Sequence, residues 1–287
     1  LKLLMATLAR YEGASSQRIN ASKSGFMVHS GMPRSRRSVI QRITGFPQKE
    51  FPICYLGSPL FVGRQKKTFF QDLVSKVLAR VALWKHRLLS PGGRIILIKH
   101  VLSSIPLHLL AAVSPPKSIL ALVERLFANF LWGAAGGVPK RHWISWKELC
   151  VAKEEGGIGF RSMEDVVKSF SVKLWWQFRQ NSSLWSNFMM VKYAPNVHPG
   201  MVGASVGASA MWRRMLQVRN LAEQHITFVV RSGSSNFWFD NWLGSGPLSG
   251  RLGNVSDHRI LDFLIEGSWN YQLLSGWVPG DILSEIS

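Results

Sequence analysis

Three consecutive segments with the signals of α-helices constrain the fold of this chain more than any other feature of its sequence. They span residues 68–88, 90–105 and 116–133, and the first and third repeat their apolar residues at the spacing of an α-helix. The second segment begins with Ser and then Pro, residue types that are typical of a helix N-cap and first turn. The apolar stripe of the third consists of Leu120, Val123, Phe127, Phe130 and Leu131. Such helices, joined by short connections, predict a packed helical unit.

Shorter elements are expected on both sides of this unit. Residues 25–29 have the pattern of a short strand after a turn, and residues 30–50 are basic with the composition of a loop. Within residues 226–242, two runs rich in aromatic and β-branched residues flank Ser-Gly-Ser-Ser, which predicts a β-hairpin. Further helices are expected at 1–13, 162–178, 183–193 and 209–223. The predicted fold class is therefore α+β and predominantly helical.

The chain is expected to contain three regions. A Gly-rich stretch at residues 133–140 indicates a boundary. We expect a first region at 1–66, a basic helical region at 67–133 and a Trp-rich region at 134–287. Within the last region, the small residues of 194–209 suggest a flexible linker.

Positive charge is concentrated in the first half of the chain. Residues 1–150 carry 23 Lys and Arg against 5 Asp and Glu, whereas residues 151–287 carry 12 against 11. A one-sided excess of this size favours a polyanionic partner, and nucleic acid is the first candidate because released counterions drive its binding. An acidic membrane surface is a weaker candidate, since the basic residues are dispersed through helices and do not form one block beside an apolar span.

Cysteine usage and hydropathy favour an intracellular protein, in the cytoplasm or the nucleus, that is not secreted. Cys54 and Cys150 are far apart and form no CxxC pattern, so neither a disulfide framework nor a zinc site is predicted. Residues 1–10 lack the apolar core of a signal peptide. The most apolar long window, residues 94–113, is interrupted by one Lys, two His and one Pro, which makes it a poor membrane span.

The acidic residues and histidines predict no catalytic or metal site. Glu154-Glu155 and Glu164-Asp165 are the two adjacent acidic pairs, and the sequence contains no Asp-Asp. The first pair precedes a Gly-Gly turn, and the second lies in the first turn of a predicted helix, where acidic residues stabilise the helix dipole. Two-metal phosphoryl chemistry needs carboxylates gathered around both ions, and the eight His show no HxxxH or HExxH spacing.

The basic residues of the helical region predict a phosphate-facing surface. Lys76, Arg80 and Arg87 lie within roughly 40° of one another on a helix with about 100° per residue. Any one of these residues is most simply a solvated surface charge, but the group has few acidic residues to pair with. The candidate phosphate contacts are Arg64, Lys66, Lys67, Lys76, Arg80, Arg87, Arg94 and Lys99.

Four tryptophans in the second half have two open interpretations. They could stack on nucleic-acid bases, although core packing is the commoner role of a Trp in an apolar pattern. These residues are Trp143, Trp146, Trp175 and Trp176.

The order of five motifs resembles the reverse transcriptase of plant non-LTR (LINE-type) retroelements. The motifs are "YEGASSQRINASKSGF" (11–26), "FPICYLGSPLFVGR" (51–64), "WKHRLLSPGGRIILIKHVLSSIP" (84–106), "EEGGIGFRSM" (154–163) and "FWFDNWLGSGPL" (237–248). Each motif alone is weak, but five in this order are specific and cover most of the chain. One departure is "ASSQ" in place of the usual "ASGQ".

The resemblance assigns roles to particular residues. It makes residues 1–66 a remnant of the polymerase palm, in which Lys23 matches the motif D lysine, a proposed proton donor to the leaving pyrophosphate. The turn Tyr55-Leu56-Gly57 is similar to the primer-grip turn. Residues 67–133 match the thumb, which holds the template–primer duplex, and residues 134–287 match the connector region.

The resemblance also indicates what this chain does not contain. The fingers, most of the palm and the three catalytic carboxylates, which bind Mg²⁺ in the complete polymerase, are expected upstream of Leu1. A zinc-binding segment and an RNase H-like domain are expected downstream. We therefore expect a fragment of a longer polyprotein that binds RNA or an RNA–DNA duplex and is inactive as a polymerase on its own.

Three alternatives remain open from the sequence. The chain could be a non-enzymatic protein-interaction scaffold that uses its Trp-rich second half. It could be a retroelement relic without a selected function. It could also be an unrelated enzyme, which would require carboxylates converging on a pocket, for example around Asp240 or Asp257, and we expect none there.

Overall fold

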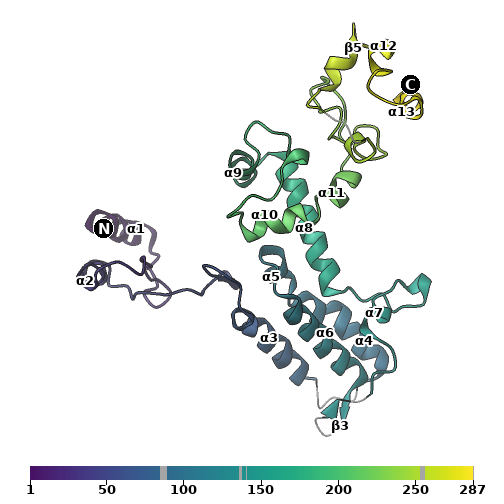
Figure 1. Ribbon diagram of the computed structural model, residues 1–287. Helices are drawn as coiled ribbons and strands as arrows, with labels where there is room; N and C mark the ends of the chain where they lie inside the picture. The colour runs from purple at the N-terminus through teal and green to yellow at the C-terminus, as the bar shows by residue number, and fades with distance from the viewer. Residues whose placement is uncertain (85–88, 136–137, 140, 253–255, 287) are drawn as a thin grey trace. The chain divides into compact units, whose positions relative to one another are not determined.

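The computed structural model describes residues 1–84, 89–135, 138–139, 141–252 and 256–286. The chain divides into two compact units, Leu1–Ser75 and Lys76–Ser287. The fold is α+β and predominantly helical, as predicted, because the strands are short and pair only in two-stranded sheets among the described residues (Figure 1).

The first unit contains two helices where the sequence indicated one. Helix α1 (Lys2–Ser15) continues through Gly13 and contacts α2 (Arg34–Thr44). The prediction of a loop at 30–50 was wrong for α2, because the composition of this segment, with four arginines, resembles that of a loop. Pro33 precedes α2, and Gly45, at φ 69°, ends it. The strand predicted at 25–29 was also wrong, since only one parallel bridge forms there, between Phe26 and Gln48.

A tight hairpin forms at the Pro- and Gly-rich stretch. Strand β1 (Ile53–Tyr55) pairs antiparallel with β2 (Ser58–Leu60), with Tyr55 opposite Ser58. The two connecting residues, Leu56 and Gly57, have φ of 47° and 79°. Positive φ at both positions is the backbone of a type I′ turn, which matches the twist of paired strands. Leucine rarely adopts this conformation, and its side chain is left in solvent.

The three helices predicted between residues 68 and 133 are present. A 3₁₀ turn (Lys67–Phe70) precedes α3 (Gln71–Ala82), so helical structure begins one residue before the predicted start at 68. Helix α4 (Pro91–His100) is capped by the Ser90 side chain, as expected, but it ends before residue 105, and α5 (Leu107–Ala112) follows. Helix α6 (Lys117–Trp132) buries the whole predicted apolar stripe.

The second unit is organised around the long helix α8 (Met163–Gln180). Helices α5, α6, α9 (Leu184–Tyr193), α10 (Ala210–Leu216) and α11 (Arg219–His225) all contact α8 (Figure 1). The single helix predicted at 209–223 is therefore two helices. The linker predicted at 194–209 is partly packed, because Ala194 and Ala208 are buried in a cluster with Trp175, Phe178 and Trp212. Between α6 and α8 lie β3 (Ala134–Ala135), β4 (Val138–Pro139) and α7 (Trp146–Leu149).

A buried arginine connects three of these helices. Arg214 of α10 donates hydrogen bonds to the Ser171 hydroxyl and to the backbone carbonyls of Leu110 and Val167. Burial lowers the pKa of its guanidinium. A buried cation with several oxygen partners fixes α10 against α5 and α8 in one arrangement.

The β-hairpin predicted at 226–242 was wrong. Asn236 instead accepts the backbone N–H groups of Trp238 and Phe239 on its side-chain oxygen, which turns the chain. Phe237 and Trp238 are consequently both buried, whereas strand alternation would place them on opposite faces. The short hairpin of this region is β5 (Leu264–Ile265) with β6 (Ser268–Trp269), and α12 (Tyr271–Leu274) and α13 (Gly280–Ile286) pack on the same core.

Short 3₁₀ turns complete the described structure. They are Lys67–Phe70, Leu102–Ser104, Lys153–Glu155, Pro199–Met201, Leu248–Gly250 and Ile260–Phe263. None of the helices in the described ranges combines the length and the apolar character needed to cross a membrane.

Candidate nucleic-acid interface

In the first unit, the candidate residues cluster at the β1–β2 hairpin and after it. Tyr55, Leu56 and Gly57 are exposed at the hairpin tip. Arg64, Lys66 and Lys67, on the following connection, are exposed as well. Lys23 is exposed in a separate turn, where its backbone carbonyl accepts a hydrogen bond from Lys49 Nζ at 2.6 Å. The proton-donor role of Lys23 and the grip role of the hairpin stay predictions.

In the second unit, α3 presents two cations on its outer face. Lys76 and Arg80 are exposed and lie one helical turn apart. Leu73 and Val77, which line the adjacent face of the helix, are buried. Trp84, just beyond α3, contacts Phe130 of α6 with ring centroids 5.8 Å apart. Arg87, the third residue of the predicted basic face, lies outside the described residues.

The two candidates on α4 have intramolecular partners. Arg94 Nη1 donates to the carbonyl of Leu131 in the last turn of α6, at 3.2 Å. Lys99 Nζ donates to the carbonyl of Ile158 at 2.5 Å and lies 5.8 Å from the centroid of the Phe160 ring. Both side chains are half-buried. Each therefore holds neighbouring segments together and has less capacity for phosphate than an exposed cation.

Glu124 is the one acidic residue between residues 76 and 133, and Asp72 lies one helical turn before Lys76 on α3. Glu124 is half-buried on α6, and its carboxylate accepts the backbone N–H of Met163 at 2.7 Å. Burial, partly offset by this hydrogen bond, raises the pKa of Glu124 above its ordinary value. Its carboxylate is thus hydrogen-bonded to the backbone at the start of α8.

The four tryptophans singled out in the sequence have different environments. Trp175 is fully buried against Phe178 and Trp212. Trp146 packs between Phe127 and Phe160, at centroid distances of 6.0 and 4.9 Å. Core packing therefore explains two of the four. Trp176 is 43% exposed and Trp143 is 74% exposed, so these two remain available for stacking.

A buried ionic cluster, formed by Arg179, His198, Glu223 and Asp240, was not predicted. Arg179 of α8 forms ion pairs with both carboxylates, and its Nε lies 2.9 Å from Glu223 Oε1. His198 Nε2 lies 3.0 Å from Asp240 Oδ1, and the Asn236 backbone N–H donates to Asp240 Oδ2 at 2.8 Å. Successive members of the cluster are 17 to 25 positions apart along the chain, and Arg179 and Asp240 are 61 apart, so no local motif could have revealed them.

The two carboxylates of this cluster have opposite pKa shifts. Burial raises the pKa of Glu223 more than Arg179 and the Trp175 N–H lower it. Burial would also raise the pKa of Asp240, but the His198 hydrogen bond, the charges of Arg179 and His198 and the Asn236 N–H together lower it. Asp240 is accordingly a buried anion held by Arg179, His198 and the Asn236 backbone N–H.

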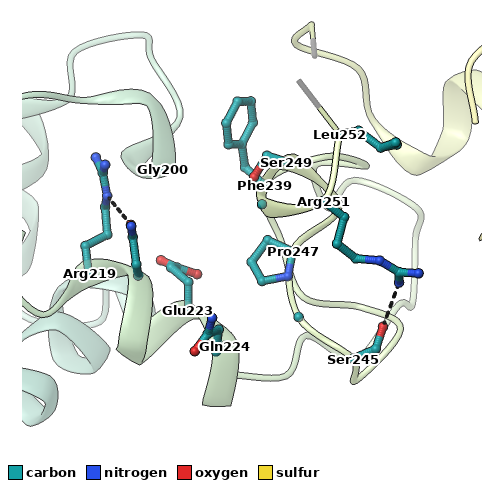
Figure 2. A pocket seen from close by; sticks show the side chains of 13 residues that line it. Gly200, Arg219, Glu223, Gln224, Phe239, Ser245, Pro247, Ser249, Arg251 and Leu252 are labelled. Atoms are coloured by element: carbon teal, nitrogen blue, oxygen red, sulfur yellow. Dashed lines mark hydrogen bonds between the residues drawn. The ribbon is translucent and has the colours of Figure 1, made fainter. Parts of the chain in front are cut away.

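A pocket of about 510 Å³ adjoins the cluster. Figure 2 shows Glu223 and Gln224 of α11 on one side and Phe239, Pro247 and Arg251 on the other. Glu223 is the one carboxylate among the residues that line this pocket, and Asp240 is not among them. Within the described ranges, no group of three His, Cys, Asp or Glu side chains could hold a metal ion. The cluster therefore has the character of a structural lock between α8, α11 and the 236–242 turn.

The fold and the composition define a class of protein: a predominantly helical α+β chain with a basic first half and a Trp-rich second half. No protein-family model matches the chain. It is 31% identical over 199 residues to an Arabidopsis thaliana protein provisionally named a ribonuclease H protein, which covers 66% of this chain and 32% of that relative.

Two further relatives cover overlapping shares of the chain. An uncharacterized mitochondrial protein of Arabidopsis thaliana is 25% identical over 49% of this chain and 93% of its own length. An uncharacterized 149 kDa protein of the transposon TX1 from Xenopus laevis is 27% identical over 57% of this chain and 12% of its own length. The chain thus spans about a third of the first relative and about an eighth of the TX1 protein, and the similarity associates it with transposon-related proteins.

Proposed function

We propose that this chain is a nucleic-acid-holding segment of a non-LTR retroelement reverse transcriptase. The observation that carries the proposal is the outer face of α3, where Lys76 and Arg80 are both exposed one helical turn apart. The similarity to a transposon protein and the order of the five motifs support the same assignment.

The proposed ligand is RNA or an RNA–DNA duplex, held through its backbone. Exposed Lys and Arg side chains displace condensed counterions from phosphates, and this gives affinity without sequence preference. Within the first unit, Arg64, Lys66 and Lys67 are exposed candidates for phosphate contacts, and the exposed Tyr55-Leu56 tip is the candidate contact for the strand terminus.

Polymerisation is not proposed for this chain alone. The complete family enzyme would use Mg²⁺ held by carboxylates, but the described residues offer no group of three suitable ligands. The residues present therefore do not fit that ion, and the catalytic step would belong to another part of the polyprotein.

Replacing the two cations of α3 tests the proposal. The Lys76→Ala/Arg80→Ala variant should bind a labelled RNA–DNA hybrid about tenfold more weakly at roughly 0.1 M salt, because two phosphate contacts are lost. Fluorescence anisotropy measures the change. Lys168→Ala/Lys173→Ala is the matched control, since it removes the same charge from exposed positions on α8. Equal losses of affinity in both variants would show that binding depends on net charge and not on a defined surface.

A protein-interaction scaffold is a second candidate. Helix α9 exposes Leu184, Phe188 and Val191, which lie on one face at helical spacing. If this face is the working surface, the α3 variant binds nucleic acid as the wild type does. Sedimentation would then show a concentration-dependent association that Leu184→Asp abolishes.

A further inference from the structure

The segment between β4 and α7 is anchored beside the end of α6. His142 Nε2 lies 3.1 Å from Asn129 Oδ1, within hydrogen-bond distance, and the His142 ring stacks on Trp132 with centroids 6.4 Å apart. Asn129 and Trp132 both belong to the last turn of α6. His142 therefore fixes the backbone on which its two neighbours, Arg141 and Trp143, are carried.

Trp143 is left in solvent at this fixed position. Its side chain is 74% exposed, whereas Trp146, three residues later, packs into the core between two Phe rings. A Trp that remains in water leaves apolar area exposed, and binding a partner would bury that area. An anchored, exposed Trp is thus a candidate contact residue.

The surroundings of Trp143 are cationic. The Arg141 guanidinium carbon lies 5.4 Å from the centroid of the Trp143 ring, within the range of a cation–π contact. Arg94 reaches the same helix end and donates to the Leu131 carbonyl. The sequence has no Asp or Glu between residues 125 and 147. Glu148 is the next acidic residue, and its carboxylate accepts the Ser145 backbone N–H at the start of α7. A flat aromatic surface beside a guanidinium suits a ligand that combines a planar ring with phosphate.

We propose that Trp143 and Arg141 form a stacking site for an unpaired nucleobase. This inference rests on the proposed function and narrows it, because it adds a base contact at a place separate from the outer face of α3. In a duplex, both faces of each base are covered by neighbouring bases, so the Trp143 ring can stack only on a single-stranded stretch or an end. The ligand class is therefore single-stranded RNA or DNA next to the duplex.

The experiment compares two single-stranded oligonucleotides of the same length, one intact and one with abasic nucleotides. Both carry the same phosphate charge, so their difference in affinity reports base contacts alone. Wild type should bind the intact strand about 5- to 100-fold more tightly, the range expected for one or two stacked bases. Trp143→Ala should lose most of this preference while its affinity for the abasic strand stays unchanged. Trp143→Phe should keep part of the preference.

Trp176→Ala is the matched control, because Trp176 is 43% exposed on α8 and lies on a different element. It should retain the wild-type preference. A Trp143→Ala variant that still prefers the intact strand as strongly as the wild type would overturn the stacking site and leave the proposed function standing. If thermal melting shows that the Trp143→Ala variant does not fold, the Trp143→Phe and Arg141→Ala variants provide the test. The site is overturned if both variants prefer the intact strand as strongly as the wild type does.

Failure of the proposed function would have a different signature. Wild type would then bind neither oligonucleotide nor the RNA–DNA hybrid at low salt. A protein partner that covers Trp143 would produce equal wild-type affinities for intact and abasic strands, and this result also overturns the stacking site.

Discussion

At the scale of single residues, the main feature that the sequence did not predict is a cluster of buried charged side chains. Arg179, Glu223 and Asp240 come from three segments that are remote in sequence, and each looks like an ordinary polar residue in its local context. Their burial depends on which helices pack together, so periodicity and capping rules could not locate them. Removing one partner of such a cluster leaves another charge buried without compensation.

Asp240→Asn should destabilise the chain by about 3 kcal/mol at pH 7, since it leaves Arg179 and His198 without their shared anion. The pKa of Asp240 is lowered in the folded state, so its contribution is complete above the ordinary value of 3.8 and is lost as the pH falls below it. The stability difference between wild type and variant should therefore shrink toward zero below that pH. Urea unfolding at several pH values measures it.

Asp281→Asn is the control for this prediction. Asp281 is mostly exposed, with a single cation, Arg251 Nη2, 3.9 Å from its carboxylate. We expect a change within about 0.5 kcal/mol there. An Asp240→Asn difference that is equally small at pH 7, or that does not depend on pH, would contradict the assignment of the cluster as a structural lock.

The two cysteines should react at very different rates. Burial, followed by the charges of Glu124 and Asp165, raises the pKa of the Cys150 thiol to about 11, whereas Cys54 is exposed. Because the thiolate is the reactive form, we expect alkylation of Cys150 at pH 7.5 to be at least about tenfold slower than that of Cys54. Iodoacetamide labelling of Cys54→Ser and Cys150→Ser variants separates the two rates. Equal rates would show that Cys150 is accessible.

At the scale of elements, capped amphipathic helices could be predicted and irregular segments could not. Ser90 and Ser162 both cap the helices that follow them, and α6 buries its predicted stripe. The hairpin prediction for residues 226–242 was wrong because alternating aromatic residues also occur in a turn that packs against a core formed by residues distant in sequence. Asn236 determines that turn through two backbone N–H groups, a contact that composition does not reveal.

The candidate surface was predictable only in part, for the same reason. Helical spacing correctly placed Lys76 and Arg80 on an exposed face. It could not show that Arg94 and Lys99 reach carbonyls of residues 37 and 59 positions away. A long cationic side chain on a packed helix can either donate to a backbone carbonyl of the protein or remain free to bind phosphate. Which of the two occurs depends on how the helices pack.

Ser162→Ala should weaken α8 measurably. The Ser162 hydroxyl accepts the Asp165 backbone N–H at 3.0 Å, which satisfies a group that the first helical turn leaves without a partner. We expect a loss of about 1 kcal/mol in the free energy of unfolding, monitored by circular dichroism in urea. Ser169→Ala on the same helix should change stability much less, because its hydroxyl donates to a carbonyl already within the helix. A larger loss in Ser169→Ala would contradict this account of the cap.

At the scale of the whole molecule, charge and aromatic content are separated along the chain. The first 150 residues carry an excess of 18 positive charges, and the remainder is close to neutral. The described cores of the second half are rich in Trp and Phe, with Trp175, Trp212 and Trp238 fully buried. This division fits the proposed basic holding surface supported by an aromatic-rich scaffold.

The salt dependence of nucleic-acid binding tests this account most directly. Affinity for an RNA–DNA hybrid should fall linearly on logarithmic axes between about 50 and 200 mM salt, by roughly 100-fold if about four phosphates are contacted. Two hybrids of unrelated sequence should give the same line. The Lys76→Ala/Arg80→Ala variant should give a slope smaller by about 2. A flat response to salt in the wild type, or binding of one sequence only, would contradict the account.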